Sequence, residues 1–234
     1  MMMDKELLQR HFVKSEITNS YDLFIYLKNL NLLENSPKYW WPDYGTFYVV
    51  ISAILTQNTK WINVEKSLQN INSLYYNQFD SYDDNNLLNF IANIDTVLLS
   101  QIIAPSGFKN QKAQRLKLLS NNILKDFEEF ENFKSSVTRN WLLKQKGLGL
   151  ESADAILCYC CGNDVMVVDS YTKKLLLSYG YEFETYDEIK DWLEFGINEN
   201  YDKITQIYDK TIELNEIYAI FHGKIVEYMK KDYI

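Results

Sequence analysis

Apolar residues recur at helical spacing along most of this chain. From Phe47 to Leu55 the apolar side chains fall on one helical face, at positions i, i+3, i+4, i+7 and i+8. A second amphipathic stripe runs from Leu116 to Phe127, behind a basic start. Alternation of apolar and polar residues, which marks a half-buried strand, is rare, and no repeat of fixed period occurs. The pattern predicts an all-α protein with core helices in both segments.

Helix breakers separate the predicted helices. The chain has three prolines, Pro37, Pro42 and Pro105, and we expect each in a loop because proline lacks the N–H that a helix interior needs. The segment Val165–Val168 is rich in β-branched residues and is open to a strand interpretation. Because it is short and has no evident pairing partner, we interpret it as an extended connector.

Length and charge limit the classes of function. A chain of 234 residues suffices for one large domain or two small lobes. Its 47% hydrophobic and 24% charged residues are typical of a soluble globular protein. No apolar run approaches the roughly 18 residues of a membrane span, and the N-terminus has no hydrophobic signal core, so we expect no membrane partner and a cytoplasmic location. The net charge of −8 is the wrong sign for a protein that coats nucleic acid, so any DNA contact must be local.

Cysteine and histidine give no metal site. Cys158, Cys160 and Cys161 are crowded together, which excludes a disulfide framework and does not match the spacing of a zinc site. We interpret them as reduced cysteines on a helix. His11 and His222 are too far apart in sequence to predict a shared metal ion.

A Gly-x-Gly turn is the first candidate for chemistry. In Lys146-Gly147-Leu148-Gly149 two glycines surround one apolar residue, between two predicted helical segments, and permit a tight hairpin with exposed backbone amides. We expect the next helix to begin near Ser152 and to add the positive end of its dipole, so that a DNA phosphate can dock without a large positive charge. Alone this motif is weak, because helix C-caps and turns also use glycine.

An aspartate at a fixed distance strengthens the motif. Asp169 follows Gly149 by twenty residues, directly after the apolar connector and before Ser170, a candidate helix N-cap. The whole pattern resembles the helix-hairpin-helix DNA glycosylase superfamily, which contains endonuclease III. The resemblance implies that the hairpin residues Lys146 to Gly149 bind the DNA backbone and that Asp169 is catalytic.

The same resemblance implies two helical lobes with an active-site cleft between them. The central lobe would span about residues 45–160 and include the hairpin at 146–150. The second lobe would combine about residues 1–44 with the helices of about 161–234. The similarity covers roughly residues 30 to 230.

Three further segments are similar to the superfamily. Ile51–Thr59 resembles its early helix and turn, which implies that Gln57 enters the gap left by a flipped nucleotide. Gly107–Ala113 resembles the loop whose apolar residue, here Phe108, wedges into the base stack. Tyr218–Lys224 is similar to its last core helix. Basic residues of the segments near these matches would lie along phosphates or form solvated helix faces: Lys109, Lys112, Arg115, Lys117, Lys144 and Lys146.

Two departures indicate the branch of the superfamily. Bifunctional members carry a Schiff-base lysine two residues after the second hairpin glycine, and this chain has Glu151 there. A carboxylate forms no imine, and Lys144 and Lys146 lie on the wrong side of the hairpin, so we expect hydrolysis without strand cleavage. The iron-sulfur cluster common in the superfamily needs four cysteines after the last core helix, and none follows Cys161. We expect no cluster.

Aromatic residues indicate the substrate. Trp40-Trp41-Pro42 and the run from Thr56 to Trp61 resemble the 3-methyladenine DNA glycosylase III branch. The resemblance implies that Trp40 and Trp61 stack on an alkylated base, with Trp41 and Pro42 lining the pocket. Phe is more common in that branch at the position of Trp61.

Two lysines complete the set that the resemblance implies. Lys224 would be carbamylated and Lys230 would reach the base pocket. From spacing alone, both are equally consistent with solvated helix residues. A monovalent cation would bind the hairpin carbonyls when DNA is bound.

These inferences predict a monofunctional DNA glycosylase for base excision repair. It would flip out and hydrolyse alkylated purines, principally 3-methyladenine, from double-stranded DNA, as a monomer in the bacterial cytoplasm with the nucleoid. One alternative is an endonuclease III-like glycosylase and lyase for oxidised pyrimidines. Others are a non-catalytic helix-hairpin-helix protein that binds DNA and a helical scaffold that uses its 18 tyrosines for protein contacts.

Overall fold

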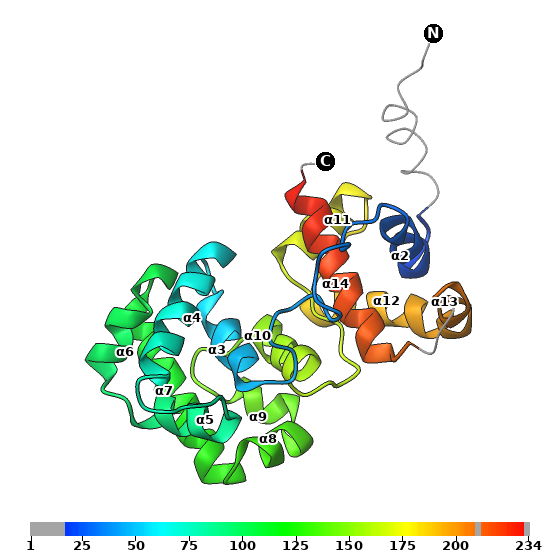
Figure 1. Ribbon diagram of the computed structural model, residues 1–234. Coiled ribbons are helices and arrows are strands. Elements are labelled where there is room, and N and C mark those ends of the chain that lie inside the picture. The colour runs from blue at the N-terminus through cyan, green and yellow to red at the C-terminus, as the bar shows by residue number, and fades with distance from the viewer. Residues whose placement is uncertain (1–16, 209–211, 232–234) are drawn as a thin grey trace. The chain divides into compact units, whose positions relative to one another are not determined.

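A computed structural model describes residues 17–208 and 212–231 of the chain. Helices and no strand are found in these residues, which confirms the all-α prediction. The chain divides into two units, which we describe separately (Figure 1): unit 1 comprises residues 1–41 and 164–234, and unit 2 comprises residues 42–163. These boundaries lie close to those expected for the two lobes. Residues 1–16 of the expected second lobe, and with them His11, lie outside the described residues.

Unit 2 is a set of helices around one apolar helix. Its elements are α3 (Phe47–Leu55), α4 (Trp61–Tyr75), α5 (Asp84–Asn93), α6 (Thr96–Ile102), the 3-10 turn η1 (Ala104–Ser106), α7 (Lys109–Phe127), α8 (Phe130–Ser136), α9 (Arg139–Leu143), α10 (Leu150–Ala155) and the π-helical turn η2 (Ile156–Cys160).

The central helix of unit 2 is α3. Every residue of α3 is buried, and it packs against α4, α7, α10 and η2. A helix that is apolar on all sides is stable only inside a core, which explains why its neighbours present single apolar stripes. The stripe on α7 faces inward as predicted. Residues 56–60 connect α3 to α4. Because α3 is buried, this connection begins at the edge of the core.

The cysteines lie where α10 continues into η2. Cys158 and Cys160 are buried, Cys161 is half-buried, and all three are reduced thiols, as we interpreted them. Burial raises the pKa of the Cys160 thiol well above its usual range, and a hydrogen bond with Cys161 raises this pKa further, by a smaller amount. A thiol with a raised pKa is a poor nucleophile. The cluster therefore acts as packing.

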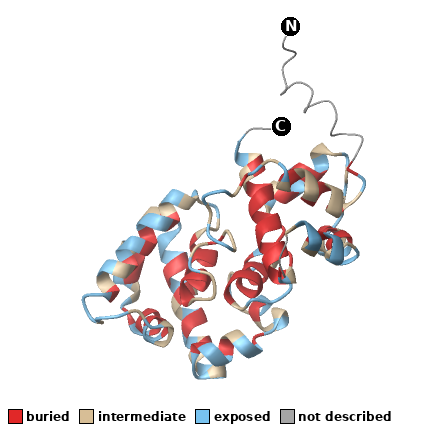
Figure 2. Cartoon of the chain, turned by 45° about the vertical axis from the view of Figure 1, so that its right-hand side comes forward, coloured by how far each residue is buried: buried red, intermediate tan, exposed pale blue. Residues whose placement is uncertain are grey.

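Unit 1 is built around the long C-terminal helix. Its elements are α2 (Ser20–Lys28), α11 (Ser170–Ser178), α12 (Tyr186–Asn198), α13 (Tyr201–Ile207) and α14 (Leu214–Lys230). Helix α14 is buried over most of its length and packs against α2 and α11, as Figure 2 shows by colour. Helix α2 also packs on α12, where Ser20 Oγ donates a hydrogen bond to the Leu193 carbonyl at 2.8 Å. No helix in the described part of the chain is long and apolar enough to cross a bilayer.

Three local predictions need correction. Pro105 lies inside the single turn of η1, where the first residues of a helix need no N–H donor, rather than in a loop. Helix α10 begins at Leu150, not near Ser152, because Gly149 adopts the extended backbone of an N-cap. The N-cap of α11 is Asp169, not Ser170. The segment Val165–Val168 is an extended connector, as predicted.

Candidate functional site

Asp169 ends the buried connector of unit 1 and begins α11. One of its carboxylate oxygens, Oδ1, accepts hydrogen bonds from the backbone N–H of Thr172 at 2.8 Å and from its hydroxyl at 2.9 Å. This N-cap fixes the side-chain rotamer. The other oxygen, Oδ2, lies 3.7 Å from Nε2 of His222 on α14. The chain thus fixes one oxygen of the carboxylate for structure and directs the other toward a buried imidazole.

The surroundings of Asp169 favour its ionised form. Burial opposes ionisation and is the largest single influence on the pKa of Asp169. The nearby imidazole of His222, whose Nε2 lies 3.7 Å from Oδ2, and the two Thr172 donors together outweigh burial and lower the pKa of Asp169 below its usual value. Asp169 is therefore a carboxylate throughout the neutral pH range.

Trp40 also contacts His222. The two rings meet edge to face, with centroids 5.2 Å apart and planes at 83°. Trp40 has φ +64°, a left-handed conformation that costs roughly 1–2 kcal/mol for a residue with a Cβ. Strain of this kind persists only where surrounding contacts hold the residue in place. His222 therefore links the carboxylate of Asp169 to an aromatic side chain within one unit.

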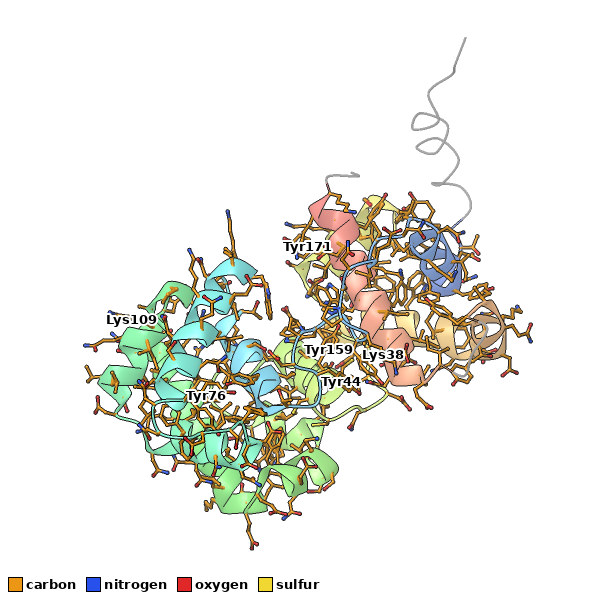
Figure 3. The ribbon with its side chains drawn as sticks, viewed as in Figure 1. Lys38, Tyr44, Tyr76, Lys109, Tyr159 and Tyr171 are labelled. Atoms are coloured by element: carbon orange, nitrogen blue, oxygen red, sulfur yellow. The ribbon has the colours of Figure 1, made fainter. Side chains whose placement is uncertain are left out.

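Helix α14 holds the segment around Trp40 in place. Lys38 forms an ion pair with the buried carboxylate of Glu216 at 3.0 Å, and Figure 3 labels Lys38 beside α14. Gly223 lets the indole approach the helix, because a Cβ built on Gly223 would lie 2.3 Å from Trp40 Cγ. Trp41 is buried and meets the Trp40 ring edge to face. Pro42 is half-buried and begins unit 2.

The hairpin is a tight turn in unit 2. Gly147 has φ +87°, and its missing Cβ would lie 2.3 Å from Nε of Arg115. Gly149 is exposed, and a Cβ there would meet no atom within 4 Å. Leu148 is buried, whereas Lys146 is exposed. Gly147 is therefore required by the fold of the hairpin itself, while Gly149 leaves its surface open to another molecule.

Gln57 is bonded to this hairpin. Its Nε2 donates to the Gly147 carbonyl and to Ser152 Oγ, both at 3.0 Å, and its Oε1 accepts from Arg115 at 2.9 Å. Both ends of the side-chain amide are therefore engaged inside unit 2. Entry of Gln57 into a DNA helix stays a prediction that requires these bonds to exchange.

Phe108 stands at the tip of a rigid loop. Its side chain is 64% exposed, its φ is +46°, and it directly precedes α7. The backbone of Phe108 is left-handed, and its exposed phenyl ring contributes little to the packing of unit 2. This geometry is compatible with the wedge role, which stays a prediction.

The expected basic surface is smaller than the sequence indicates. Lys112 is 1% exposed, so its expected position along a phosphate or on a solvated face is wrong. Lys117 donates to the Ile94 carbonyl, and Arg115 to Gln57. Lys109 is exposed and is labelled at the start of α7 in Figure 3. Lys144 and Lys146 are exposed as well.

Two further predicted site residues lie on α4 and α14. Trp61 begins α4 in unit 2 and donates from its indole N–H to Glu65 at 2.9 Å. Its stacking opposite Trp40 stays a prediction. Lys230, near the end of α14, forms an ion pair with Glu227 at 3.1 Å.

Lys224 is a buried amine on α14. It is 7% exposed, and the described residues supply no hydrogen-bond or ion-pair partner for it. Burial, and after it the charge of Lys28, lowers the pKa of Lys224. The neutral amine is therefore more populated than in an exposed lysine.

No cluster of metal ligands is found in the parts of the chain that the structure describes. An iron-sulfur cluster of the kind held by four thiolates does not fit this chain, because it has three cysteines and two of them are buried among packed side chains. No step of the chemistry below uses such a group.

Sequence reasoning missed four residues that organise these sites. His222 lies inside a helix that is buried on nearly every side, so its position carries no periodic signal. Lys112 does carry one, because it lies four residues before Leu116 and so extends the apolar stripe of α7. Glu216 and Arg115 are recognisable only from their partners.

Comparison with known proteins places the chain in context. Residues 51–194 match the model of the HhH-GPD superfamily base excision DNA repair proteins. A candidate DNA repair glycosylase of Methanocaldococcus jannaschii is 34% identical over 200 residues, which are 82% of this chain and 80% of that protein.

Solved structures are similar over most of the chain. The H. pylori 3-methyladenine DNA glycosylase MagIII, bound to 1,N6-ethenoadenine, is 49% identical, with a TM-score of 0.88 over 92% of this chain and 99% of that one. A trapped covalent intermediate of endonuclease III with DNA is 14% identical, with a TM-score of 0.61 over 90% of this chain and 85% of that one. The second similarity supports the fold alone.

Proposed function

We propose, from the premise that the chain belongs to the HhH-GPD superfamily of base excision DNA repair proteins, that it is a DNA glycosylase that excises alkylated purines, principally 3-methyladenine. One observation carries this proposal: Asp169 and Trp40 both lie against a single buried histidine. A carboxylate and an aromatic ring so linked are what base recognition and glycosidic hydrolysis require together. The 49% identity to a 3-methyladenine DNA glycosylase supports the substrate.

The alkylated base does much of the chemistry. Methylation at N3 of adenine gives the base a positive charge, so the electron pair of the N-glycosidic bond leaves readily with it. The sugar develops oxocarbenium character, water attacks C1′, and the water proton passes to solvent. The products are free base and an abasic site. Because the base is charged before it leaves, the enzyme needs little general acid.

Asp169 acts mainly through its charge. A general base works best with a pKa near the working pH, and the pKa of Asp169 is lowered instead. A persistent carboxylate is suited to stabilising a cationic sugar and to orienting the attacking water. Thr172 holds one oxygen, which leaves Oδ2 to approach the sugar.

Aromatic faces select the cationic base. The electron-rich face of an indole attracts a positive ring, by roughly 2 kcal/mol when the site is desolvated. Trp40 would supply this face, with Trp41 and Pro42 beside it. Trp61 as the opposite stacking partner and Lys230 as a pocket residue are proposals that rest on the resemblance.

DNA would bind through neutral donors as much as through charge. Backbone amides of the hairpin from Gly147 to Gly149 would contact a phosphate, with Lys146 beside them. Phe108 would enter the base stack and Gln57 the vacated gap, which offsets the cost of extruding the nucleotide. Alkylated double-stranded DNA is thus the proposed partner of a monomeric protein in the cytoplasm. A monovalent cation would bind the hairpin carbonyls when DNA is bound.

Strand cleavage is not part of the proposed reaction. The position two residues after Gly149 is Glu151, which cannot form an imine with the abasic sugar. The nearest lysines, Lys144 and Lys146, lie before the two hairpin glycines instead. This favours a monofunctional enzyme over an endonuclease III-like glycosylase and lyase.

The first experiment is incubation of the purified protein with methylated duplex DNA. We expect free 3-methyladenine by chromatography and intact strands by gel analysis of the same samples. Nicking without alkali would contradict the monofunctional proposal and favour the lyase. Binding of the DNA without release of a base would contradict the enzyme and favour a DNA-binding module.

Lys224 has the chemistry for a carbamate. Only a neutral amine attacks CO2, forming an N–C bond and releasing one proton, and the lowered pKa of Lys224 favours that form. The resulting anion would be attracted by the charge of Lys28. We expect the protein under 13CO2 to give a carbamate carbon signal in its NMR spectrum that Lys224→Met lacks. An identical signal in both proteins would contradict this assignment.

A further inference from the structure

The ammonium group of Lys112 caps two helices of unit 2. Its Nζ donates to the Leu55 carbonyl at 2.8 Å and to the Ser106 carbonyl at 2.7 Å. Leu55 is the last residue of α3, and Ser106 is the last residue of η1. The C-terminal end of a helix carries partial negative charge and unsatisfied carbonyls, so a cation there is favourable.

Each capped residue lies two positions before a residue proposed to enter DNA. Leu55 precedes Gln57, and Ser106 precedes Phe108. The backbone bonds of each segment are local, such as Gln57 N–H to the Ile54 carbonyl at 3.4 Å and Gly107 N–H to the Ala104 carbonyl at 3.1 Å, and none of these joins one segment to the other. One buried lysine therefore fixes two loops that are far apart in the sequence.

Arg115 extends this connection to the hairpin. It lies one turn after Lys112 on α7, donates to Gln57, and packs directly against Gly147. Gln57 in turn donates to the Gly147 carbonyl. Gln57 and the hairpin therefore contact Arg115 of α7, and the segment before Phe108 is bonded to Lys112 of the same helix.

A buried ammonium is costly, which makes simple packing a poor explanation for Lys112. Burial, followed by the charge of Arg115, lowers the pKa of Lys112 to about 8. An apolar side chain of similar length would avoid this desolvation, although it would leave the two carbonyls without a donor. Lys112 therefore costs stability through desolvation, while its two hydrogen bonds define the geometry of both segments.

We propose that Lys112 is a positioning residue for base extrusion, which holds Gln57 and Phe108 at the separation that lets both engage the DNA at once. This inference rests on the proposed glycosylase function. Small misplacements of groups that act together are costly, by up to roughly 100-fold in rate. Lys112 is not a catalytic residue, because it lies buried between two carbonyls and touches no reacting atom.

The test separates extrusion from chemistry with two substrates. An oligonucleotide with a single adenine is methylated and then annealed either to its full complement or to a strand that leaves a bubble around that adenine. Single-turnover rates of base release are measured for the full chain and for Lys112→Met. The control is Lys125→Met, which removes an exposed lysine near the other end of the same helix.

We expect Lys112→Met to lower the rate on the full duplex about tenfold relative to the bubble. In the bubble the adenine is already unpaired, so the positions of Gln57 and Phe108 matter less. Lys125→Met should keep the wild-type ratio of the two rates. An equal loss on both substrates, or no loss on either, would overturn the inference. Wild-type protein that releases no base from either substrate would overturn the proposed function and this inference with it.

A second measurement applies if Lys112→Met does not fold. Gln57→Ala and Phe108→Ala are then combined in a double-mutant cycle on the full duplex. A shared anchor predicts coupling, with the double variant losing less than the product of the single losses. Independent, multiplicative losses would overturn the inference.

Discussion

Asp169→Asn is expected to lower the rate of base release by about 10²–10³-fold, because it removes the charge that stabilises the cationic sugar. The substitution leaves the fold intact. Asparagine is as good an N-cap as aspartate, and its carbonyl can still accept from Thr172. Loss of a negative charge should leave DNA affinity the same or higher. Single-turnover assays with methylated DNA, paired with binding measurements, separate the two effects.

Asp164→Asn is the matched control for this prediction. Asp164 is exposed and belongs to the same unit, five residues earlier in the chain. It should release base at the wild-type rate. If Asp169→Asn also released base at that rate with a normal unfolding curve, the catalytic assignment would be wrong.

Gly223→Ala is expected to lower kcat/KM about 10- to 100-fold through Trp40. In an ordinary helix interior this change stabilises by about 1 kcal/mol. Here the new Cβ would lie 2.3 Å from Cγ, 2.7 Å from Cδ2 and 2.8 Å from Cβ of Trp40. Overpacking of this kind costs typically 1–3 kcal/mol, which exceeds the gain in propensity. The indole must therefore shift, and with it the stacking on the base, worth about 1–3 kcal/mol.

A double-mutant cycle tests the route of this effect. If Gly223→Ala acts through the indole, adding it to Trp40→Ala should cause little further loss of kcat/KM. Losses that multiply in the double variant would show that Gly223 acts elsewhere on α14. Wild-type kcat/KM for Gly223→Ala alone would contradict the proposed position of Trp40 in the base pocket.

Local pattern was sufficient to predict two core helices, the extended connector and the hairpin turn of this protein. The apolar stripes of α3 and α7 and the connector before Asp169 follow from spacing alone. The hairpin follows from two glycines, of which Gly147 has the positive φ that the turn needs. These features depend on neighbours in the sequence.

Features that depend on distant partners were not predictable in this way. Lys112 reads as one more basic residue until α3 and η1 supply the two carbonyls that turn it inward. His222 gains its role from Asp169, which lies more than fifty residues away in the chain. The strained φ of Trp40 follows from contacts with α14 and has no sequence signature. The resemblance pointed to Asp169 and Trp40, and the structure shows that His222 contacts both within unit 1.

The inward turn of the basic side chains on α7 has a consequence for how damage is found. Lys112, Arg115 and Lys117 bind internal oxygen atoms, which leaves Lys109 exposed at the start of this helix. With few phosphates neutralised, few counterions are released, so affinity for undamaged DNA should depend only weakly on ionic strength. Dwell times on intact sequence should then be short. Discrimination between damaged and undamaged DNA then depends more on contacts with the damaged base than on contacts with the DNA backbone.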